Sequence, residues 1–148
     1  MELEQIYLAV ADRLAEIEDL KWIDMDFGQL DDFNVRPSVA FPCALISTDI
    51  TNAIELGQKK QKCQIVINVK LGFSYTGETS QRTAAYHKQK ALAYYHTVRE
   101  VYTKLQGQRI ESTTPLRRTQ QIETARPDRI KITEMPFSTE FLDVSAAE

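Results

Sequence analysis

The residues with the clearest potential for chemistry lie in the stretch "KWIDMDFGQLDDF", residues 21–33. Four aspartates fall within nine positions there: Asp24, Asp26, Asp31 and Asp32. Carboxylates this close together could hold a divalent cation or work as an acid–base pair. A calcium loop of the EF-hand type needs glycine at its sixth position and glutamate at its twelfth. Counted from Asp24, these positions hold Gln29 and Val35, so the stretch does not fit that template.

A metal-dependent enzyme using Asp24, Asp26 and a third acid such as Asp32 is one hypothesis for this stretch. No histidine, cysteine or further acid elsewhere has the ligand spacing that would complete such a site. His87 and His96 are nine residues apart on a predicted helix, which puts them about 180° apart, on opposite faces. The alternative is that the aspartates form the solvated face of an edge strand and its turn, and we favour it.

Basic residues form a second group with possible function. The stretch "GQKKQK", residues 57–62, could join a later pair of arginines in a basic patch made of Lys59, Lys60, Lys62, Arg117 and Arg118. A nucleic-acid-binding module is therefore another hypothesis. The patch lacks the interleaved aromatic residues of a single-strand binder, and the net charge of −3 argues against nucleic acid as the main partner. A solvated loop or an electrostatic protein interface fits better, with no specific nucleic acid as partner.

Two helices and one long strand are the clearest elements that could position these groups. Apolar residues at steps of three and four predict a helix over 2–17. The run "CQIVINVKLGFSY", residues 63–75, has seven successive odd positions that are apolar, which predicts a strand with one buried face. At roughly 3.3 Å per residue this strand spans about 40 Å, so we expect part of it to extend past the body of the domain. A second helix is predicted over 80–107, with Gly107 as its stop.

The other strand-like runs in the sequence are residues 22–27, 38–47, 117–124 and 129–143. The run 38–47 is apolar on both phases, which predicts a strand covered on both sides, although Pro42 cannot donate to a ladder. In the last run the apolar phase changes near Met135 and Pro136, which predicts a bulge there. Strands joined directly to strands predict an α+β fold: a mostly antiparallel sheet with two helices packed on it, in a single domain, residues 1–148.

The segment between two of these strands, residues 48–61, is long for a hairpin connection. It reads "TDITNAIELGQKKQ" and keeps Ile50, Ile54 and Leu56 at its centre. An extended arm that contacts a neighbouring subunit is one interpretation. A flap folded back on its own domain is the other, and the sequence does not choose between them.

The composition is that of an ordinary globular chain, with 43% hydrophobic and 26% charged residues. No apolar run approaches the roughly 20 residues of a membrane span, so no membrane partner is expected. The N-terminal stretch lacks the basic region of a secretion signal, and the spacing of Cys43 and Cys63 is not that of a metal motif. We expect both cysteines to be buried, reduced thiols in a protein made in the cytoplasm.

Taken in order, these elements and several local phrases resemble those of phage tail terminator-like or tail-completion proteins. The phrases are "GQLDD", "RPSVAFPCALIS", "VYTKLQG", "LRRTQQIE" and "MPFSTEFLD". The resemblance is to small prophage-encoded proteins of Bacteroides-type bacteria and covers most of the chain. It includes no catalytic signature.

The resemblance implies a non-enzymatic virion assembly protein that caps the tail tube or joins tail to head. Tail terminators form hexameric rings, so the implied partners are further copies of the chain, a tail-tube protein and a head–tail connector protein. No enzyme activity, catalytic residue, metal or cofactor is implied. The segment 48–61 becomes the candidate contact with a subunit or the tube, through Ile50, Ile54, Leu56, Lys59, Lys60 and Lys62. A head–tail connector of similar fold and the metal-dependent enzyme remain alternatives.

Overall fold

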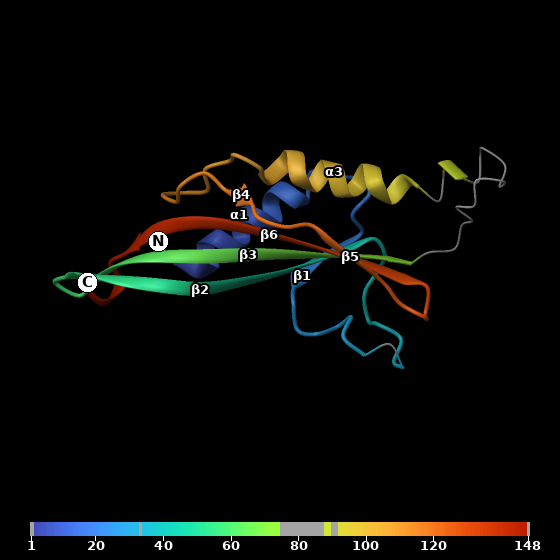
Figure 1. Ribbon diagram of the computed structural model, residues 1–148, viewed down its shortest axis with the longest axis horizontal. Coiled ribbons are helices and arrows are strands. Elements are labelled where there is room, and N and C mark those ends of the chain that lie inside the picture. The colour runs from blue at the N-terminus through green and yellow to red at the C-terminus, as the bar shows by residue number, and fades with distance from the viewer. Residues whose placement is uncertain (1, 33, 75–87, 90–91, 148) are drawn as a thin grey trace.

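The computed structural model describes residues 2–32, 34–74, 88–89 and 92–147. Its six strands are β1 (Trp22–Met25), β2 (Cys43–Gly57), β3 (Lys60–Ser74), β4 (Arg117–Arg118), β5 (Ile122–Ala125) and β6 (Ile130–Asp143). Two helices, α1 (Leu3–Leu14) and α3 (Ala93–Leu105), and a short 3₁₀ turn, η1 (Ser145–Ala147), complete the described elements. Figure 1 shows β2, β3 and β6 running side by side along the length of the molecule.

The strands form one mixed sheet in the order β1-β2-β3-β6-β4, with β5 also paired to β6. β1 pairs with β2 in parallel, and all the other pairs are antiparallel. The predicted α+β class, with a mostly antiparallel sheet and two helices packed on it, is therefore confirmed for the described residues. The parallel edge pair was not predicted.

The central strand β3 confirms the alternation in its sequence. Its odd positions from Cys63 to Phe73 are all buried, and they belong to one hydrophobic cluster with both helices. We call this side of the sheet the helix face. α1 contributes Ile6, Val10 and Leu14 to the cluster, and α3 contributes Val98, Val101 and Leu105. Since both helices bury their apolar stripes here, the main core lies between the helix face and α1 and α3.

The opposite side of the sheet, which we call the open face, is covered only near one end. There Leu30, from the segment between β1 and β2, packs against Cys43 and Leu45, with Ile132 of β6 beside them. This second cluster explains why the apolar phase changes along β6: Ile132 faces Leu30, whereas Met135 and Phe137 face the helices. The pairing of β6 with β3 runs without a shift from Ser74 to Gln61, so the bulge predicted near Met135 and Pro136 is wrong.

Other predicted boundaries also change. The strand predicted over 38–47 begins only at Cys43, directly after Pro42, and its buried part is Cys43 to Ile46. The run 117–124 is divided between the short strands β4 and β5. Of the helix predicted over 80–107, α3 is the long described part; residues 75–87 and 90–91, and with them His87, lie outside the described residues.

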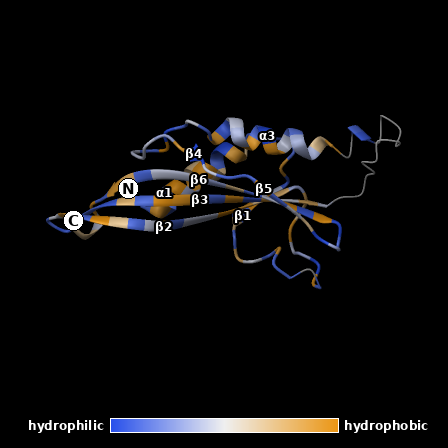
Figure 2. Cartoon of the chain, in the orientation of Figure 1, coloured by the Kyte–Doolittle hydropathy of each residue, from blue (hydrophilic) through white to orange (hydrophobic). Residues whose placement is uncertain are grey.

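The segment 48–61 is not a loop. Residues 48–57 continue β2, paired with β3 as far as Gly57 and Lys60, so only Gln58 and Lys59 form the turn. Both turn residues have positive φ, 55° and 63°, as in the two-residue turn that suits the twist of a hairpin. The segment is therefore the far half of a long β2–β3 hairpin, which is the geometry of an arm rather than of a folded-back flap. In Figure 2 hydrophobic residues persist along β2 towards this end of the molecule.

Candidate assembly surface

Two of the four aspartates, Asp26 and Asp31, lie beside a lysine. The Nζ of Lys70 lies 3.1 Å from a carboxylate oxygen of Asp26, 3.4 Å from Asp31 and 3.9 Å from Glu134. The Lys70 and Asp26 side chains are only 15% and 14% exposed. Burial alone would lower the pKa of Lys70, but its hydrogen bonds to Asp26 and Asp31 and their negative charges outweigh it and raise the pKa. The lysine ammonium thus occupies the position that a bound cation would take.

The other two aspartates of this stretch accept hydrogen bonds from nearby backbone N–H groups. The carboxylate of Asp24 accepts the N–H of Met25 at 2.8 Å, and that of Asp32 accepts the N–H of Asn34 at 2.9 Å. Among the described residues none of the four aspartates belongs to a group of three metal-ligand side chains.

One such group does occur in the described part of the chain, and the sequence did not predict it: Asp19, His96 and Glu100. His96 and Glu100 form an i,i+4 pair on α3, with Nε2 and Oε1 2.5 Å apart, and the hydroxyl of Thr97 lies 3.4 Å from Asp19. Asp19 and His96 are exposed. These contacts identify the group as a surface pair, His96 and Glu100, with Asp19 beside it.

The basic residues do not gather into one patch. Lys59 is in the hairpin turn and Lys60 begins β3, whereas Lys62 is 3.4 Å from Glu140. Arg117 and Arg118 pair with Ser138 and Phe137, about five residues along β6 from the turn, which is roughly 17 Å. The arrangement places acids between the two groups of bases and does not form a continuous electropositive track.

Part of the outer edge of β2 has no described strand paired to it. The N–H of Asp26 donates to the carbonyl of Ile46 at 3.0 Å, so the backbone groups of Ile46 face β1. Because backbone direction alternates along a strand, the groups of Thr48 and Ile50 face the same side. β1 ends at Met25 and no other described strand pairs there, so this stretch of β2 is an open edge.

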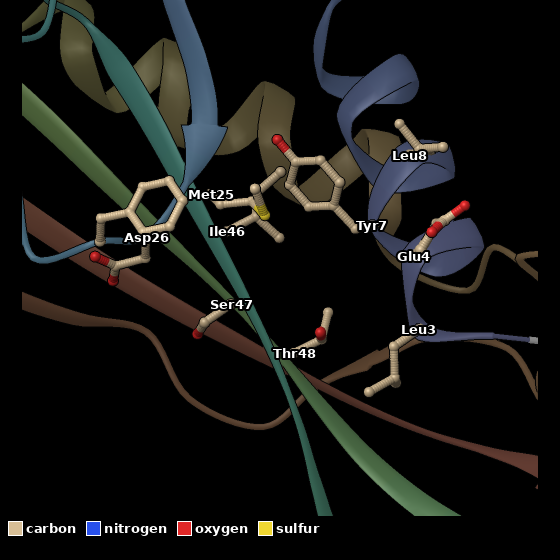
Figure 3. Close-up of a pocket in the computed structure, with 10 residues that line it drawn as sticks. Leu3, Glu4, Tyr7, Leu8, Met25, Asp26, Ile46, Ser47 and Thr48 are labelled. Carbon is tan, nitrogen blue, oxygen red and sulfur yellow. The ribbon is translucent and has the colours of Figure 1, made fainter.

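A groove of about 530 Å³ adjoins this open edge, between α1 and β2. Figure 3 shows Tyr7 of α1 projecting over it towards Met25 and Ile46, with Leu3 and Thr48 at its other end. Phe27, beside it, is 72% exposed, and Leu8 and Met25 are about half exposed. The charged residues that line the groove are acidic, Glu4 and Asp26. An apolar groove with acidic borders at a sheet edge is typical of a protein-docking surface.

The three apolar residues predicted as a contact, Ile50, Ile54 and Leu56, are all exposed. They do not form one stripe, however. A bulge between Ile50 and Asn52 reverses the phase of β2, so that Ile50 pairs with Ile65 on the helix face and Ile54 pairs with Lys62 on the open face. A second irregularity separates Glu55 from Gly57, at Leu56.

The sequence contained a signal for the groove that the prediction did not use. Tyr7 and Leu8 lie off the apolar stripe of the predicted first helix, and Phe27 continues the apolar phase of β1 beyond its end. Large apolar residues outside a buried stripe mark a second contact surface. Lys70 gave no comparable signal, because its acidic partners are distant in the sequence.

Compared with protein-family models and with curated protein sequences, the chain has no match to either. Among the described residues, no helix is both long and apolar enough to cross a membrane.

Proposed function

We propose that this protein is a non-enzymatic assembly protein of a phage virion, in which a ring of subunits caps the tail tube or joins tail to head. The observation that carries the proposal is the open edge of β2 together with the adjoining apolar groove. Such an edge is a template for association, and a groove bordered by exposed Leu8, Met25 and Phe27 gives a partner apolar area to bury.

The long β2–β3 arm also supports this function. Its far half carries exposed Ile54 and Leu56 next to the lysine-bearing turn, so it offers apolar and basic side chains to a second partner. In the proposed ring, the β2 edge contacts a neighbouring copy and the end of the arm contacts a tail-tube or connector protein. The sequence resemblance to tail terminators supports the same role, and so does the apolar groove at the open edge.

The terminator and connector roles share the ring and differ in the protein bound to it. The metal-dependent enzyme is the less supported alternative, because Lys70 pairs with Asp26, and Asp24 and Asp32 accept hydrogen bonds from nearby backbone N–H groups. Calorimetry with magnesium, manganese and calcium tests it, and binding heat that disappears in an Asp24→Asn, Asp26→Asn variant would favour the enzyme.

Light scattering across micromolar to millimolar concentrations tests the proposed function. We expect a mass that rises with concentration and then stays constant at a closed oligomer of about six copies. The same series with magnesium should give the same masses. A chain that remains monomeric over the whole range contradicts the proposal.

A further inference from the structure

The sheet register places opposite charges at the two edges of the molecule, in the same rows. Asp49 of β2 pairs with Val66, Val66 pairs with Ser138, and Ser138 pairs with Arg117 of β4. These four residues therefore form one straight row across the sheet, with an acid at one end and a base at the other. Side chains of directly opposed residues point to the same face, so Asp49 and Arg117 both lie on the open face.

The adjacent row lies on the helix face and ends in a base at β4, whereas the acid near its β2 end belongs to α1. It runs from Thr48 through Ile67 and Phe137 to Arg118. At the β2 end, Glu4 of α1 lines the groove together with Thr48. At the β4 end, the guanidinium of Arg118 stacks on Tyr102, 3.9 Å from the ring centre, and so remains on the helix side of the sheet.

Neither charge of the first row can be neutralised by the other within one chain. Three strand spacings of about 4.8 Å separate Asp49 from Arg117, or roughly 14 Å. Both side chains are exposed, and among the described residues neither has an ion-pair partner. The complementary partner for each edge is thus the other edge of a second copy.

We propose that the β2 edge of one subunit binds the β4 edge of the next, with Asp49 against Arg117 and the Glu4 side of the groove against Arg118. This inference rests on the proposed ring and identifies the contact between neighbouring subunits, which we call the joint. The N–H of Arg118 already donates to Oε1 of Gln106 at 2.8 Å, so side chains rather than a continuous strand ladder make the contact.

The relative position of Asp49 and Arg117, at the two ends of one row, bears on whether a ring can close. A head-to-tail contact closes into a ring only if successive copies do not shift along the ring axis. Asp49 and Arg117 lie at the same height along the strands, because they end the same row. Their pairing therefore joins the end of a row in one copy to the end of the same row in the next, with no offset in register between copies.

Charge reversal tests this joint. In Asp49→Arg, or in Arg117→Asp, both contacting edges carry the same sign, so we expect the concentration for half-assembly to rise at least about tenfold at low salt. Combining both substitutions in one chain should restore assembly. An equimolar mixture of the two single variants should restore it too, since complementary edges can then alternate around the ring.

Matched controls are Glu18→Arg and Arg99→Asp, which reverse exposed charges of the same types outside the two rows. Thermal melting of each variant checks that the fold is retained, because all four side chains are exposed. If wild type assembles and the controls and the row variants assemble equally well, the joint is wrong while the ring stands. If reversal weakens assembly but neither the double variant nor the mixture restores it, the pairing of these two residues is also wrong. A monomeric wild type contradicts the ring itself.

Discussion

Replacing Lys70 by methionine should measure how far the aspartates depend on this lysine. Methionine keeps an apolar stem of similar length but removes the ammonium group from Asp26, Asp31 and Glu134. The carboxylate of Asp26, which is nearly buried, then loses its nearest positive charge. Breaking a fully buried ion pair costs about 3–5 kcal/mol, and breaking an exposed one about 0–1 kcal/mol. Because Lys70 and Asp26 are each about one-seventh exposed, we expect a loss of about 2–3 kcal/mol in unfolding free energy.

Urea unfolding at neutral pH measures this loss. With a denaturant dependence of about 2 kcal/mol per molar, the midpoint should fall by about 1–1.5 M. Lys62→Met is the matched control, because Lys62 lies on the same strand and the same face and pairs with Glu140 at 3.4 Å. Its side chain is 52% exposed, so we expect a loss below about 1 kcal/mol. If Lys70→Met loses no more than Lys62→Met, the acids around Lys70 do not need its charge and our reasoning is refuted.

The pH dependence follows from the raised pKa of Lys70. A lysine pKa that is higher in the folded than in the unfolded chain stabilises the fold fully below the unfolded value, about 10.4. This contribution is lost as the pH rises through the folded value. As the pH rises from neutral, wild type should therefore lose part of its advantage over Lys70→Met once the solution is alkaline, and a loss near neutral pH would contradict the assignment.

Two further predictions concern the buried cysteines and the packing around Cys43. Cys43 and Cys63 are buried and unpaired, and burial raises the pKa of Cys43 to about 11. A thiol reagent should therefore label neither cysteine in the folded protein and both in urea. Rapid labelling of the native protein would contradict this. In Gly72→Ala the new Cβ would lie 2.8 Å from Sγ of Cys43 and 2.9 Å from Cδ1 of Leu30. We therefore expect overpacking to lower the unfolding free energy by about 1–3 kcal/mol. An unchanged melting temperature would show that the neighbouring side chains can shift to make room for the methyl group.

The parts of the fold that depend on one buried face could be predicted from the sequence. The alternation from Cys63 to Phe73 is uninterrupted because each of these odd positions is buried in the one cluster on the helix face. β6 gave a misleading pattern because Leu30 covers the open face at one end only, so Ile132 is buried on the phase opposite to Phe137. A change of covered face and a bulge produce the same sequence signal, and only the register distinguishes them.

The arm was predicted poorly for a related reason. An edge strand that is exposed on both faces has no burial to impose alternation, and the bulge before Asn52 reverses the phase between Ile50 and Ile54. The turn at Gln58 and Lys59 lacks the Asn-Gly or Gly-rich signal usual for a hairpin. The open edge was not predictable either, since it exists only because β1 joins β2 in parallel and stops at Met25.

The charges at the two sheet edges also disfavour one mode of association, the contact between two β2 edges. Two copies meeting through their β2 edges would bring the acids Glu4 and Asp49 of each copy together, and like charges across a contact oppose it. The bulge before Asn52 further limits the straight part of the edge, as bulges do in proteins that resist edge-to-edge pairing. The β4 edge carries the opposite charge at the same height. The features that disfavour a symmetric dimer thus leave the head-to-tail contact available, and repetition of that contact gives a ring where its rotation closes and a filament where it does not. A mass that stops rising with concentration therefore identifies closure, and continued growth identifies an open joint.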